Sequence, residues 1–224
     1  MQKRGQITIF VIIGIVIIAA VSLLLYLSSK ANEAKLGTEF SDTTQLPIEI
    51  QQQKENIESC LEDKIKEAAR IIGNSGGYIL NKPTKTINYN EEEIAYIDSI
   101  SKENIQNEIQ ESIKENFGQC KDNSDVDNVE IEILEEKIKV NAEMPINLES
   151  GDSSVKVSFF TAEHNVKLGS MLTIIENSKD NLDCMTCLID EAENNKMKIT
   201  INILDNAKIM EINDENYMFN FAID

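Results

Sequence analysis

The sequence predicts an α+β protein in which an N-terminal transmembrane helix is followed by a soluble domain of amphipathic helices and antiparallel strands. Three observations lead to this class. Residues 7–27 form one uncharged apolar run. Apolar residues then recur at steps of three and four between positions 57 and 117, and from position 131 onward they alternate with polar residues. A helical part followed by a stranded part is typical of α+β domains.

The apolar run at residues 7–27 has the length of a membrane-crossing helix, about 20 residues at roughly 1.5 Å per residue. A cleaved signal peptide is the alternative, but its apolar region usually spans only about 7 to 15 residues. Here Val21 and Leu23 carry the run beyond the small residues Ala19 and Ala20. We therefore expect the helix to remain in the bilayer.

The basic residues around this run predict its orientation. Lys3 and Arg4 are concentrated in a short tail before it, whereas Lys30 and Lys35 follow it within a longer polar segment. Because basic residues near a membrane-spanning helix favour the cytoplasmic side, we expect residues 1–6 in the cytoplasm and the large domain outside the cell.

The remaining chain divides into a linker and a domain. Residues 28–47 are polar, contain Gly37 and end at Pro47, so they predict a linker or stalk. Residues 48–224 are the expected extracytoplasmic α+β domain. It is either one unit or two subdomains, a helical one at 48–121 and a mostly stranded one at 122–224.

Two amphipathic helices are expected in the first part of this domain. One carries an apolar stripe at residues 57–72 and ends in a glycine-rich segment, after which residues 78–80 predict a short strand. The other is predicted to start at Asn90 and to present a stripe over residues 94–117. Four acidic residues of this helix are expected on its solvated face: Glu103, Glu108, Glu111 and Glu115.

Alternation dominates the second part. Residues 131–142 predict a hairpin with its turn at Glu135 and Glu136, and residues 155–159 continue the strand pattern. Helical spacing returns at residues 166–175, with the single histidine, His164, near the expected helix start. A short helix at 188–189 and three final strands are then expected, at 197–204, 208–212 and 217–223.

The chain carries a formal net charge of −18. An acidic surface repels nucleic acid, so nucleic-acid binding is excluded as an expected function. The charge is explained most simply by solubility; an acidic surface that gathers cations or a basic partner is the alternative. No catalytic, phosphate-binding or dinucleotide-binding motif is present. We therefore expect no cofactor, and a non-enzymatic role is favoured.

All four cysteines follow the apolar run: Cys60, Cys120, Cys184 and Cys187. An even number of cysteines in an extracytoplasmic domain predicts disulfides. Three pairings are open. We favour Cys60 with Cys120, because each sits beside an amphipathic helical segment, which leaves Cys184 with Cys187.

The Cys184-Met185-Thr186-Cys187 segment has three interpretations: a local structural bridge, a reactive thiol pair at the start of a helix, or part of a metal site. Zinc would need further ligands, and the chain has one histidine. We predict no metal site here. An acidic group, Asp122, Asp125, Asp127 and Glu130, suggests either calcium or a solvated turn, and the turn is favoured because glycine and the EF-hand spacing are missing.

The N-terminus carries the sequence KRGQITIF at residues 3–10. It resembles the class III prepilin leader of archaeal type IV pilins and of related archaeal membrane-anchored surface proteins. The resemblance implies cleavage between Gly5 and Gln6 on the cytoplasmic side, with the helix left in place. Thr8 matches the hydroxyl residue of the pattern, whereas Phe10 stands where the pattern has glutamate. Residues 57–80 are also similar to those anchored proteins.

Together these features predict a single-pass protein of the cell surface. Its acidic, disulfide-stabilised outer domain would have a structural or protein-interaction role, in the manner of a pilin. The alternative is a membrane-tethered thiol–disulfide oxidoreductase that uses Cys184 and Cys187. The expected partners are the lipid bilayer through residues 7–27 and other envelope proteins, with homo-oligomerisation left open.

Overall fold

The computed structural model describes residues 47–121, 126–151, 153–179, 184–204 and 207–224. The expected tail and transmembrane helix lie outside these ranges, as does the expected stalk except for its last residue, Pro47. Within them, no helix is both long enough and apolar enough to cross a membrane. Residues Pro47–Asp224 form one compact unit. It contains helices and antiparallel sheets, so the predicted α+β class is confirmed for this part of the chain.

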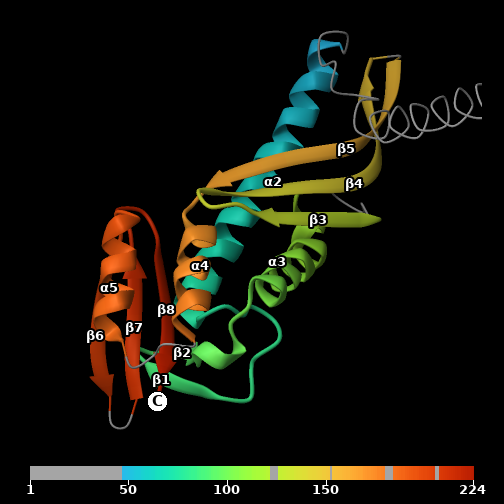
Figure 1. The fold of residues 1–224 in the computed structure, drawn as a ribbon. Helices are drawn as coiled ribbons and strands as arrows, with labels where there is room; N and C mark the ends of the chain where they lie inside the picture. Colours follow the sequence, from blue (N-terminus) through green and yellow to red (C-terminus); the bar gives the residue numbers. More distant parts are fainter. Residues whose placement is uncertain (1–46, 122–125, 152, 180–183, 205–206) are drawn as a thin grey trace, which may run out of the picture. The chain divides into compact units, whose positions relative to one another are not determined.

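The longest helix of the described residues, α2 (Ile48–Ser75), runs past the second sheet toward the C-terminal sheet (Figure 1). Its buried residues, which include Ile57, Leu61, Ile65 and Ile72, follow the predicted stripe. Apolar residues at this spacing bury one face of a helix. This face packs against strands of both three-stranded sheets. The helix ends at Gly76, whose φ of 78° suits glycine, and the Gly76 and Gly77 N–H groups donate to the Ile72 carbonyl.

The first hairpin corrects the predicted second helix. Strands β1 (Thr86–Tyr89) and β2 (Glu92–Ala95) pair in antiparallel fashion around Asn90 and Glu91. Both turn residues have positive φ, 51° and 70°, as tight hairpin turns require. Asn90 is therefore a turn residue and not a helix start. Ile94 extends β2 and packs against Ile209 and Ala222.

The second long helix, α3 (Lys102–Asn116), begins later than predicted and follows the 3₁₀ turn η2 (Ile97–Ser99). Ser101 caps it, because the Ser101 side chain accepts a hydrogen bond from the Asn104 N–H. The turn η3 (Phe117–Gln119) closes it. The expected strand at residues 78–80 is wrong, since these residues form no strand and two of them, Ile79 and Leu80, are bends.

The second sheet has the order β3-β4-β5, with β3 (Asn128–Ile133), β4 (Lys137–Ser150) and β5 (Ser153–Asn165). The predicted hairpin turn at Glu135 and Glu136 is confirmed. Alternate residues of β3 and β4 are buried, as the alternation predicted. His164 lies inside β5, opposite Ile138, so its predicted place at a helix start is wrong. The strand continues through Asn165, and helix α4 (Leu168–Ser178) starts only at Leu168.

The third sheet follows helix α5 (Met185–Asn194) and confirms the three predicted C-terminal strands. Strands β6 (Lys198–Leu204), β7 (Ala207–Asn213) and β8 (Met218–Ile223) form an antiparallel meander. Helix α2 contacts β8 in this sheet and β4 and β5 in the other. The helical and stranded parts of the sequence therefore share one packed unit.

Candidate functional site

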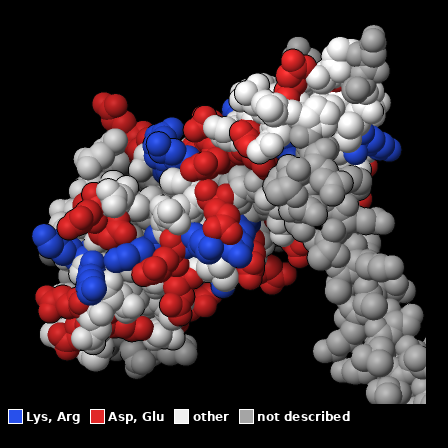
Figure 2. All heavy atoms as spheres, turned by 90° about the horizontal axis from the view of Figure 1, so that it is seen from above, with Lys and Arg blue, Asp and Glu red and all other residues white. Residues whose placement is uncertain are grey.

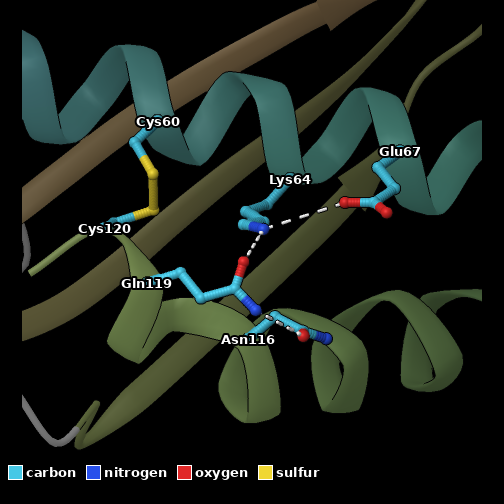
Figure 3. Close-up of a disulfide and its surroundings, with 6 residues drawn as sticks. All are labelled: Cys60, Lys64, Glu67, Asn116, Gln119 and Cys120. Atoms are coloured by element: carbon cyan, nitrogen blue, oxygen red, sulfur yellow. Dashed lines mark hydrogen bonds and ion pairs between the residues drawn. A yellow bond between two sulfur atoms is a disulfide. The ribbon is translucent and has the colours of Figure 1, made fainter.

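Cys60 on α2 is joined to Cys120, just after η3, by a disulfide with a Cα–Cα distance of 5.6 Å (Figure 3). The favoured pairing is confirmed. Both cysteines are half-buried. One turn after Cys60, Lys64 donates to the Gln119 side chain at 2.5 Å, and Gln119 donates to Asn116. The disulfide and the neighbouring polar side chains therefore connect α2 to the end of α3, as expected of a structural bridge.

Cys184 and Cys187 form the second disulfide, with a Cα–Cα distance of 5.3 Å. Cys184 is the N-cap residue of α5 and Cys187 is exposed in the first turn. A helix N-terminus stabilises a thiolate and so favours thiol exchange, whereas Asp190 on the same helix opposes it. Zinc binds cysteine as a thiolate, and the two sulfur atoms cannot be thiolates while they are bonded to each other.

The other predicted site residues are dispersed or lie outside the described ranges. Gly5, Gln6, Asp122 and Asp125 fall outside them. The Asp127 N–H donates to the Glu143 carbonyl, and this hydrogen bond holds the Asp127 backbone just before β3. In the described ranges, no three histidine, cysteine, aspartate or glutamate residues are grouped so that they could hold a metal ion.

Glu108 on α3 was expected on a solvated face, and this prediction is wrong. It is only 6% exposed, and its carboxylate accepts the backbone N–H groups of Ile79 at 2.7 Å, Leu80 at 2.6 Å and Asn81 at 3.1 Å. Burial alone would raise the pKa of Glu108, but these hydrogen bonds outweigh burial and leave the pKa lowered. The sequence held one signal, because Glu108 is three residues after Ile105 and so falls within the apolar stripe.

A cleft of about 1220 Å³ opens between α2, the β3–β4 turn, the end of β5 and the β7–β8 turn. We call it the basic cleft. Its cationic lining residues are Lys66 and Arg70 on α2, Lys137 on β4 and Lys167 before α4. His164 also lines the cleft. Burial lowers the pKa of His164; the charge of Glu62 raises this pKa, and the charge of Lys66 lowers it. The carboxylates in the lining are Glu135, Glu136 and Asp214.

Sequence reasoning missed the basic cleft because its walls come from four segments far apart in the chain. Tyr217 holds two of them together: its hydroxyl donates to the Ala69 carbonyl at 2.8 Å. Burial raises the pKa of Tyr217, and Asp214 raises it further, so its hydroxyl stays a proton donor.

Known protein families, curated proteins and solved structures contain no match to this chain. The function of the chain is therefore inferred from the chemistry of its sites.

Proposed function

We propose that the chain is a single-pass, membrane-anchored protein of the cell surface, with its N-terminus in the cytoplasm and an acidic outer domain that has a structural or protein-interaction role. The observation that carries the proposal is the pairing of all four cysteines in two disulfides. Structural disulfides persist in oxidising compartments outside the cytoplasm and are rare within it.

Two features of the sequence and surface support this proposal. The apolar run at residues 7–27 would supply the anchor, and the prepilin-like leader before it suggests a pilin-like component. Figure 2 shows aspartate and glutamate spread over one face of the molecule with lysine and arginine between them. A charged, mixed surface of this kind suits a domain exposed to water beside other envelope proteins.

Fractionation and protease shaving of intact source cells test the proposed location. We expect the protein in the membrane fraction, with residues 48–224 digested when protease is added outside. Mass spectrometry of the native protein without reduction should show both disulfides and a terminus at Gln6. A domain that stays protected in intact cells but is digested after lysis would contradict the orientation.

A second candidate function is thiol–disulfide exchange through Cys184 and Cys187. The favouring observation is the position of Cys184 at the N-cap of α5 with Cys187 exposed beside it. An external thiol would first reduce the Cys184–Cys187 disulfide and be oxidised in turn. One of the two thiolates would then attack a substrate disulfide and form a mixed disulfide, and the other would release the substrate dithiol as Cys184 and Cys187 are oxidised again.

Reduction of insulin by dithiothreitol tests this candidate. The full-length protein in detergent should accelerate the reaction, and C184A/C187A should abolish the acceleration. The matched control is T186A, which changes a residue between the two cysteines but keeps both of them, and it should retain activity. No acceleration by the wild type, or equal acceleration by C184A/C187A, rejects the candidate.

A further inference from the structure

The third sheet has an open edge at its outer strand β6 (Figure 1). The two three-stranded sheets have four outer strands, and described groups from other elements contact three of them. A side chain of α3 donates to the Ile131 carbonyl of β3, and Glu58 on α2 accepts the Thr161 N–H of β5. Tyr96 forms a β-bridge with β8. Among the described residues, by contrast, no group outside the third sheet forms a hydrogen bond to β6.

The open side of β6 is a row of backbone hydrogen-bonding groups. In an antiparallel pair, every second residue turns its N–H and C=O away from its neighbour. Strand β6 pairs with β7 in a continuous register over seven residues, without a bulge. Edge strands are usually protected by being short or bulged, by proline or by charge. Strand β6 has no proline and one charged residue, Lys198, so it can act as a template for another strand.

The charge of β6 permits a second copy of the chain to approach it. The whole chain carries −18, yet β6 contains no carboxylate. Its three isoleucines alternate along the strand with other residues. One of them, Ile203, is 80% exposed and is the most exposed large apolar side chain in the described ranges. Two β6 strands could therefore meet without opposing acidic side chains.

We propose that β6 pairs in antiparallel fashion with β6 of a second copy, so that two three-stranded sheets become one six-stranded sheet. This inference rests on the proposed interaction role and names a partner for it. In a two-fold register centred on Ile201, isoleucine faces isoleucine, polar faces polar, and no like charges meet. The opposed pairs are Ile201 with itself, Ile199 with Ile203, Thr200 with Asn202, and Lys198 with Leu204. Matched cross-strand pairs of this kind stabilise a sheet.

This self-complementarity favours a second copy over a strand of another protein. An unrelated strand would need the same alternation, whereas β6 matches itself about a two-fold axis, the commonest symmetry of protein oligomers. The assembly would also close at two copies. The other outer strand of the sheet, β8, is already bridged to Tyr96 and so offers no second edge for growth. We therefore expect a dimer and not a fibre.

Analytical ultracentrifugation of the full-length protein in detergent tests the pairing. We expect a dimer that dissociates on dilution, with a Kd raised at least about tenfold in I203K, because an unpaired ammonium group enters the row of isoleucines. The matched control is I48K, since Ile48 is 75% exposed at the start of α2, and its Kd should stay within about twofold of the wild type. Both variants should fold, because each isoleucine is already exposed in the single chain.

Cross-linking of single-cysteine variants tests the register. All four natural cysteines are in disulfides, so T200C and K198C each add one free thiol at an exposed position. In the proposed register the two copies of residue 200 are offset along the strands by about 7 Å, and the two copies of residue 198 by about 20 Å. A short thiol-to-thiol cross-linker should therefore join T200C dimers and leave K198C dimers unlinked.

Three results would overturn the proposal: a monomeric wild type, a dimer that I203K leaves intact, or equal weakening by I203K and I48K. Equal cross-linking of T200C and K198C would also contradict it, because parallel strands keep every position equally close. Since these assays use purified protein, their results are independent of the location in the cell. A dimer whose domain is protected in intact cells would refute the cell-surface location alone.

Discussion

Glu108 organises a segment that has no regular secondary structure of its own. Residues 79–81 point three successive backbone N–H groups at its carboxylate, which is the role a strand partner would otherwise fill. A carboxylate with several charge-assisted hydrogen bonds can be buried where an isolated one could not. One acidic side chain therefore fixes the path between α2 and the first hairpin.

The substitution E108Q should destabilise the protein by about 1–3 kcal/mol, because the new amide NH₂ cannot accept the N–H groups that the carboxylate accepts. Urea unfolding followed by circular dichroism measures this change. E115Q is the matched control, since Glu115 is exposed on the same helix, and should stay within about 0.5 kcal/mol of the wild type.

The effect of E108Q should also depend on pH. The pKa of Glu108 is lowered in the folded state. Its stabilisation is therefore fully present above its unfolded pKa, about 4.3, and is lost as pH falls through the lower folded pKa. Unfolding curves at pH 7 and pH 3 should show the wild type and E108Q converging at the lower pH. A constant difference would contradict the assigned role.

At the scale of elements, two glycines set how closely helices approach strands and turns. A Cβ atom at Gly73 would overlap the Met218 carbonyl oxygen of β8 and lie 3.0 Å from the Tyr217 hydroxyl. A Cβ atom at Gly169 would overlap the Leu134 carbonyl at the β3–β4 turn. In both places the obstacle is backbone, which cannot rotate away as a side chain can.

The substitution G73A should therefore destabilise the domain by about 1–3 kcal/mol, as overpacking of a closed contact does. Thermal unfolding of the full-length protein in detergent should show a lower Tm. G118A is the control, because a Cβ atom at Gly118 meets nothing within 4 Å. An unchanged Tm for G73A would mean that α2 and β8 are further apart than described.

At the scale of the whole molecule, helix α2 and the two disulfides link parts of the described unit. Helix α2 contacts both three-stranded sheets, and the Cys60–Cys120 disulfide closes a loop with a sequence separation of 60. The second disulfide closes a separation of only 3. The two bridges therefore differ in how strongly they restrict the unfolded chain.

In the chain-entropy account, C60A/C120A should lose about 4 kcal/mol of stability and C184A/C187A about 2 kcal/mol. Urea unfolding of both double variants under non-reducing conditions compares them directly, and each serves as the control for the other. A larger loss in C184A/C187A would show that the local bridge, rather than the long loop, limits the stability of the domain.

Sequence periodicity predicted much of the fold but little of the candidate site. The stripe of α2, the hairpin around Glu135 and the C-terminal strands followed from residues that are close in sequence. The number of cysteines predicted disulfides, and the helical segments beside Cys60 and Cys120 favoured their pairing. The predicted helix start at Asn90 was wrong, because asparagine is common both at helix N-caps and in hairpin turns, where it tolerates a positive φ.

By itself, the sequence determined the alternation of buried and exposed residues, since the repeat of a helix or strand is a local property. Only the tertiary structure decided that Glu108 would be buried, that His164 would lie within a strand, and that the cations of the basic cleft would line one cavity. Each depends on groups from distant segments, such as Asn81 and Glu108, which are 27 residues apart. Contacts of that kind leave no period in the sequence.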